Sequence, residues 1–112
     1  MLRRGCFTMN KLVQINKEDI ILDPEGISEM LTGCLKRKKA CVLVGSCETF
    51  STLIVSFEPS ESRCKGRIVI APIDGEGPEE VCGSIARRYA DGFSLRSSFH
   101  VNDSLWGIFL QE

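Results

Sequence analysis

The sequence predicts a mainly β, α+β fold, a small antiparallel barrel of about six strands with one or two short helices. Short segments rich in β-branched and aromatic residues recur along the chain, separated by polar turn-forming residues. Helical periodicity occurs in only two places, so strands and helices do not alternate as in a doubly wound parallel sheet. Closure into a barrel also protects strand edges that would otherwise pair with other chains.

Length and composition fit a single globular domain. The chain has 112 residues, of which 43% are hydrophobic and 26% charged, a balance sufficient for one core. Met9 and the "NKLVQI" that follows it look like a natural start. We therefore expect one domain over residues 9–112 and an upstream or disordered tail over residues 1–8.

Charge and hydropathy disfavour several classes of protein. The net charge is −1, whereas general binding to a nucleic-acid polymer needs a clear basic excess. No apolar run approaches the roughly 20 residues of a membrane-spanning helix, and no apolar signal region follows the N-terminal charges. The expected location is the cytoplasm, with no membrane span.

Two helices are predicted. In the first, Asp23 is the N-cap and Pro24 suits the first helical position. Its apolar side chains recur at helical spacing, at Ile27, Met30, Leu31, Cys34 and Leu35. The basic run at 36–39 follows, and a solvated helix end explains it more simply than a binding patch. The second helix begins at Pro78 and ends before Asp91-Gly92.

The other segments are predicted strands. Segment 93–101, "FSLRSSFHV", shows the clearest alternation, with Phe93, Leu95, Phe99 and Val101 on one face. The remaining strands are expected within residues 11–15, 40–45, 49–57, 67–72 and 105–110.

The chain carries no recognisable catalytic or metal-binding constellation. Its one histidine, His100, lies on the polar face of a predicted strand, where an exposed structural role is the simpler interpretation. Six cysteines are present without a C-x-x-C pair, so we expect no zinc site. Cys34 and Cys41 fall in apolar patterns and are expected to act as small core residues. We therefore expect a protein that is not an enzyme and has no metal ligands.

Two short motifs point instead to ligand binding. Arg63 and Arg67 form R-x-x-x-R in "RCKGR", and Asn102, Ser104 and Gly107 form N-x-S-x-x-G in "NDSLWG". Guanidinium groups bind phosphates in a bidentate manner and stack on bases. Asn and Ser side chains could hydrogen-bond a base edge, and Gly permits close approach of the backbone.

The same motifs have structural explanations that the sequence leaves open. The two arginines also suit solvent-exposed positions. Asn102 and Asp103 suit a hairpin turn, with Gly107 at a bulge or kink. Trp106, between these residues, could stack on a base or fill the core.

The motif pair resembles the PilZ domain, which binds cyclic di-GMP. In that family the arginines grip the dinucleotide and the N/D-x-S-x-x-G turn encloses a guanine. The resemblance implies a ligand site formed by Arg63, Arg67, Asn102, Ser104 and Gly107, with cyclic di-GMP as a regulatory ligand and no other cofactor.

The order of elements over roughly residues 20–112 is similar to the N-terminal domain of flagellar brake proteins, which precedes PilZ. That domain is a split β-barrel akin to flavin-binding split barrels and is a regulatory and interaction module. The resemblance implies a non-enzymatic bacterial regulatory module whose partner is a PilZ domain or a flagellar component, and it allows a homodimer. The alternatives are a flavin- or small-ligand-binding split barrel and a cysteine-based metal or redox protein.

Overall fold

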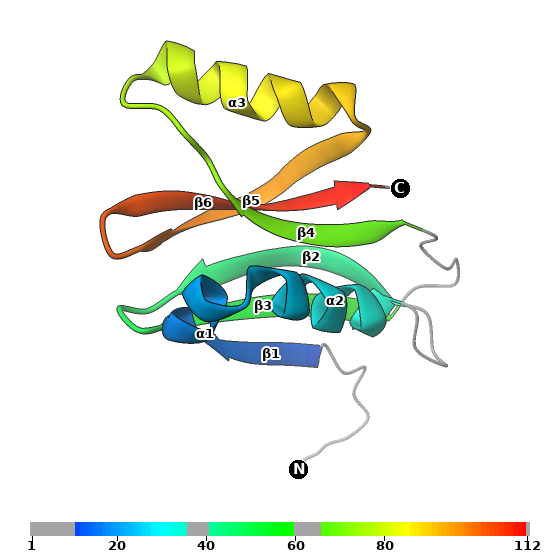
Figure 1. Ribbon diagram of the computed structural model, residues 1–112. Coiled ribbons are helices and arrows are strands. Elements are labelled where there is room, and N and C mark those ends of the chain that lie inside the picture. Colours follow the sequence, from blue (N-terminus) through cyan, green and yellow to red (C-terminus); the bar gives the residue numbers. More distant parts are fainter. Residues whose placement is uncertain (1–10, 36–40, 60–65, 112) are drawn as a thin grey trace.

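The computed structural model describes residues 11–35, 41–59 and 66–111 (Figure 1). The predicted tail over residues 1–8, the basic run at 36–39 and Arg63 lie outside the described residues. The elements in chain order are β1 (Lys11–Asn16), α1 (Lys17–Leu22), α2 (Pro24–Leu35), β2 (Cys41–Glu48), β3 (Thr52–Pro59), β4 (Arg67–Pro72), α3 (Pro78–Ala90), β5 (Phe93–Val101) and β6 (Ser104–Gln111).

The described strands form two antiparallel three-stranded sheets, with strand orders β1-β3-β2 and β4-β6-β5. The predicted mainly β class with about six antiparallel strands is therefore confirmed. The sheets are not closed into a barrel, and this is where the structure differs from the predicted architecture. Each sheet keeps two edge strands. Within the described residues, the two sheets are joined by side-chain contacts and not by backbone hydrogen bonds between strands.

Strands β2 and β5 come together where the edges of the two sheets meet, and each contains a bulge. The register shifts between Leu43 and Gly45 in β2 and between Leu95 and Ser97 in β5. A bulge bends a strand and interrupts its hydrogen-bond ladder. The two edges meet instead through side chains, because the hydroxyls of Ser46 and Ser97 form a hydrogen bond.

Helix α2 gives a reason for the open architecture, because it occupies the place of a neighbouring strand along β4. The backbone N–H of Ile70 donates to Ser28 Oγ at 2.9 Å, and that of Ile68 donates to Thr32 Oγ1 at 2.9 Å. Ser28 and Thr32 lie one turn apart on α2, so their hydroxyls match the spacing of alternate residues on the strand. The helix thus satisfies the edge of β4, which could otherwise pair with another chain.

The described residues form three helices, whereas one or two were predicted. The additional helix is α1, which Asn16 caps by accepting a hydrogen bond from the backbone N–H of Glu18 at 2.9 Å. The predicted start of α2 is confirmed: the carboxylate of Asp23 accepts from the backbone N–H of Gly26 at 3.0 Å. The helix predicted at Pro78 is α3.

Two apolar layers hold the elements together. The main core lies between the sheets and under α1 and α2, and its largest fully buried side chains are Phe57, Phe99, Ile20, Leu31, Leu35, Leu53, Ile68 and Ile108. A smaller layer lies between α3 and the β4-β6-β5 sheet, where Ala71, Ile73, Phe93 and Phe109 are buried. Helix α3 therefore covers the face of this sheet that points away from the main core (Figure 1).

Two sequence predictions about single residues concern this core. Cys34 is buried in it, as predicted, while the side chain of Cys41 is not among those described. Trp106 is partly buried against it, with its ring centroid 6.4 Å from that of Phe99. The tryptophan therefore packs against the core with part of its side chain.

Candidate functional site

The structure does not bring Arg67 together with the residues of the "NDSLWG" motif. Arg67 begins β4 and pairs with Gln111 at the end of β6, whereas Ser104 begins β6. At roughly 3.3 Å per residue, the two ends of this strand lie about 23 Å apart. Asn102 lies beyond Ser104, farther still from Arg67.

The "NDSLWG" residues have structural explanations in this fold. Asn102 has φ of 56° and, with Asp103, forms the turn closed by the pairing of Val101 with Ser104. Asparagine is among the few residues that tolerate this left-handed conformation.

Gly107 is buried in the middle of β6. A Cβ at this position would approach Phe109 Cε2 to 2.8 Å and Ile73 Cδ1 to 2.9 Å. Close packing of side chains, and not a bulge, therefore explains this glycine.

Arg67 lines a cleft of about 640 Å³ between β4, α2, α3 and the start of β5, which we call the arginine cleft. Arg88 on α3 and Phe93 on β5 line it with Arg67, and α2 contributes Glu25 and Glu29. The volume falls within the range of roughly 300–1,000 Å³ common for small-molecule sites.

Both arginines of this cleft rest on aromatic rings. The guanidinium carbon of Arg67 lies 5.3 Å from the ring centroid of Phe93, and that of Arg88 lies 5.4 Å from the centroid of Phe109. Such stacking favours the cation and restricts its orientation, but it leaves the N–H donors at the edge of the guanidinium available.

Neither arginine forms an ion pair within the part of the chain that the structure describes. The neighbouring Arg87 differs, because it donates a hydrogen bond to Ser84 Oγ at 3.1 Å. Arg67 and Arg88 are thus two held guanidinium groups with donors to spare, which is the chemistry of an anion site. Arg88 was missed from the sequence because arginines in the last turn of a helix are ordinarily explained by the helix dipole.

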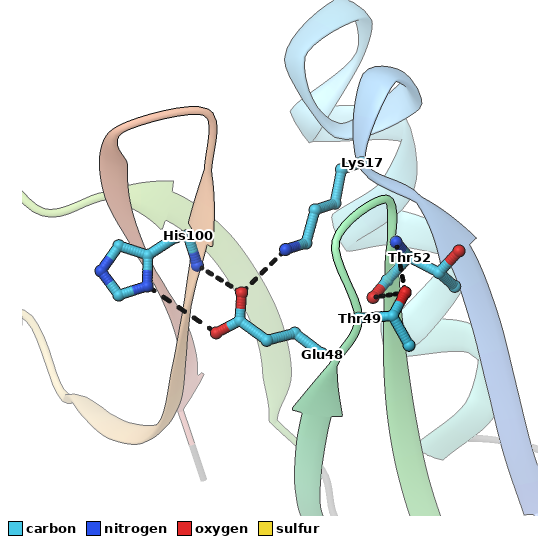
Figure 2. A network of polar contacts seen from close by, with 5 residues as sticks. All are labelled: Lys17, Glu48, Thr49, Thr52 and His100. Carbon is cyan, nitrogen blue, oxygen red and sulfur yellow. Dashed lines mark hydrogen bonds and ion pairs between the residues drawn. The ribbon is translucent and has the colours of Figure 1, made fainter.

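A second cleft, of about 650 Å³, lies between α1, the β2–β3 hairpin and the β5–β6 turn, and we call it the hairpin cleft. It contains a polar network in which Glu48 is the central group (Figure 2). Lys17 Nζ donates to Glu48 Oε1 at 2.7 Å, and the backbone N–H of His100 donates to the same oxygen at 3.0 Å. His100 Nδ1 lies 3.8 Å from Glu48 Oε2.

The network has the character of a structural ion pair. The side chain of Lys17 is only 9% exposed and that of Glu48 is 33% exposed. The hydrogen bond from Lys17, and next the one from the His100 backbone, lowers the pKa of Glu48 below its ordinary value. The carboxylate therefore joins α1, β2 and β5 at one point. His100 itself is exposed, as predicted.

Comparison with known proteins finds no matching family model, no similar curated protein and no similar solved structure. No described helix is long and apolar enough to cross a membrane. Within residues 11–35, 41–59 and 66–111, no group of three His, Cys, Asp or Glu side chains is arranged to hold a metal ion.

Proposed function

We propose that this protein is a non-enzymatic regulatory module of the bacterial cytoplasm whose arginine cleft binds a phosphorylated guanine nucleotide, with cyclic di-GMP as the candidate. The observation that supports the proposal is the pair Arg67 and Arg88, which line one cleft, rest on aromatic rings and have no carboxylate partner among the described residues. The resemblance to the N-terminal domain of flagellar brakes is part of the proposal.

The chemistry of the cleft suits both parts of such a ligand. Two guanidinium groups can each donate two parallel hydrogen bonds to phosphate oxygens. Guanine presents adjacent N1–H and N2–H donors, which a carboxylate accepts well, and Glu25 and Glu29 are exposed on the same cleft. A ligand that is anionic at one end and a hydrogen-bond donor at the other would therefore use both sets of charges.

The proposed mechanism is a change in how firmly α3 is held. No residue of α3 is fully buried, so the helix is retained by partial burial of Val81 and Ile85. A nucleotide that bridges Arg88 on α3 and Arg67 on β4 would add a contact between the helix and the sheet. Ligand binding would thus order α3 for recognition by a partner, for which a PilZ domain or a flagellar component remains the proposal.

The test is an amide NMR titration of the labelled protein with cyclic di-GMP, and in parallel with FMN. We expect cyclic di-GMP to shift resonances around Arg67, Arg88 and Phe93. Arg67→Ala and Arg88→Ala should each weaken binding about tenfold or more, since hydrogen bonds to charged groups contribute about 1.5–3 kcal/mol. Arg87→Ala is the matched control, because it removes the same charge from the adjacent residue of α3.

Other outcomes separate the alternatives. Shifts confined to residues 102–104 would contradict the arginine cleft and favour the "NDSLWG" turn as the site. Saturable shifts with FMN but not with cyclic di-GMP would favour the flavin-binding alternative. If neither ligand shifts the resonances of the arginine cleft, the nucleotide proposal is wrong.

A further inference from the structure

The side chain of Phe50 projects from the tip of the β2–β3 hairpin and is fully exposed, at 101% of its reference area. The backbone below it is firmly held. The N–H of Thr49 donates to the carbonyl of Thr52 at 2.8 Å. The N–H of Thr52 donates to Thr49 Oγ1 at 3.1 Å (Figure 2). The N–H of Lys17 donates to the carbonyl of Ser51 at 2.9 Å, which ties the tip to α1. The ring is therefore presented on a preorganised support.

The turn itself does not require an aromatic residue. Neither Phe50 nor Ser51 has a positive φ, so a polar residue would serve this solvent-exposed position at least as well. Two consecutive apolar residues of α1 are also exposed, Ile21 at 48% and Leu22 at 80% of their reference areas. Ile21 and Phe50 line the same hairpin cleft, and exposed apolar groups that gather at a concave site are typical of interaction surfaces.

The charges around these apolar side chains are mainly acidic. Glu18 and Glu48 line the cleft, Asp19 follows Glu18 on α1, and Asp103 follows the lining residue Asn102 in the β5–β6 turn. The lysine that lines the cleft, Lys17, is buried and already paired with Glu48. The exposed rim therefore favours a partner that carries positive charge.

We infer that the hairpin cleft docks a segment of a partner protein in which a large apolar side chain is flanked by lysine or arginine. The apolar side chain would pack against Phe50 and Ile21, and the flanking cations would face Glu18 and Asp103. This arrangement has the central anchor and polar rim of a protein interface. A second copy of this chain fits less well, because a two-fold interface would place the two acidic rims against each other.

The inference does not depend on the nucleotide proposal. The hairpin cleft lies at the end of β5 that carries His100 and Val101, and the arginine cleft includes Phe93 at the other end. A protein that fails to bind cyclic di-GMP could still dock a basic segment.

The experiment uses the full chain and a short fluorescent peptide with a central Trp-Leu pair flanked by lysines. Binding is followed by fluorescence anisotropy and mapped by NMR. A peptide with the same apolar pair flanked by glutamates is the charge control. We expect saturable binding of the lysine peptide only, shifts around Glu18, Ile21 and Phe50, and weaker binding at higher salt.

Phe50→Ser should weaken binding of the lysine peptide about tenfold, as removal of an anchor does. Tyr89→Ser is the matched control, because Tyr89 is an exposed aromatic residue on α3, away from the hairpin cleft. Equal binding of the two peptides, no detectable binding of the lysine peptide, or an affinity that Phe50→Ser leaves unchanged would overturn the inference. A concentration-dependent dimer that Phe50→Ser abolishes would also overturn it, since a second copy would then be the occupant.

Discussion

The two clefts have nearly the same volume, about 640 and 650 Å³, but they use charge in opposite ways. In the hairpin cleft the buried ammonium of Lys17 forms an ion pair with Glu48. In the arginine cleft Arg67 and Arg88 rest on aromatic rings, without an ion pair in the described parts of the chain. Volume alone therefore does not tell which charged groups of a cleft are already paired within the fold and which are available to a ligand. A charged group that is held in place but lacks a partner is the more informative feature.

The largest predicted effect is the loss of the carboxylate in the hairpin cleft. Glu48→Ala should lower the free energy of unfolding by about 2 kcal/mol, because it leaves a buried ammonium and a backbone N–H without their acceptor. The value lies below that for a fully buried pair because Glu48 is one-third exposed. Urea unfolding at neutral pH measures it.

Two matched variants sharpen this prediction. Lys17→Met should cost less than Glu48→Ala, because the carboxylate that remains has access to water whereas the ammonium does not. Glu58→Ala removes an exposed carboxylate from β3 and should change stability by less than about 0.5 kcal/mol. If Glu48→Ala is no more destabilising than Glu58→Ala, the ion pair is not structural and the contrast between the clefts fails.

The next effect concerns a hydroxyl group in the arginine cleft, that of Ser28, which bonds the backbone of β4. Ser28→Ala should destabilise the protein by about 1.5 kcal/mol, because the buried N–H of Ile70 loses its acceptor. Ser84→Ala is the control, since that hydroxyl bonds the carbonyl of Asp74 at the surface and should contribute about 0.5 kcal/mol. Thermal unfolding of the two variants side by side tests the difference, and equal midpoints would contradict it.

A smaller effect is expected from acid. The pKa of Glu48 is lower in the folded protein than its ordinary value of 4.5. The ionised carboxylate therefore stabilises the folded state at pH values above 4.5, and this contribution is lost as the pH falls through the lowered pKa. Wild-type stability should fall more steeply below pH 4.5 than that of Glu48→Gln, whose side chain does not titrate. Parallel slopes in urea unfolding across this range would show that Glu48 does not carry the effect.

Local patterns in the sequence predicted most elements of this fold. Asp23-Pro24 gave the start of α2, and alternation gave β5 as a strand, because both signals are local. The prediction that Phe93, Leu95, Phe99 and Val101 share one face was wrong, because the bulge between Leu95 and Ser97 leaves Phe93 and Leu95 in the layer under α3 and Phe99 and Val101 in the main core. Helix α1 was missed because its six residues are too few to show a period. The open architecture could not be predicted, since it depends on Ser28 and Thr32 reaching the edge of a strand 36 or more residues away.

The candidate site was harder to predict for the same reason. Arg67 was identified through the R-x-x-x-R motif, but its neighbour Arg88 comes from a helix that only the tertiary structure brings alongside. The "NDSLWG" motif matched a turn whose residues are already explained by the φ of Asn102 and the packing around Gly107. A short motif records residue types, whereas a site requires that they meet in space.

The smallest predicted effect is the change in stability when Arg67 or Arg88 is replaced. It best tests the contrast between the charged groups of the two clefts. If Arg67 and Arg88 are held for a ligand and not for the fold, Arg67→Ala and Arg88→Ala should each change the free energy of unfolding by no more than about 1 kcal/mol, the scale of an exposed cation–π contact. The same variants should weaken nucleotide binding about tenfold or more. Urea unfolding with and without cyclic di-GMP measures both quantities, because a ligand that binds only the folded state raises its stability. A large loss of stability without ligand would instead assign both arginines to the fold, as Lys17 and Glu48 are assigned in the hairpin cleft.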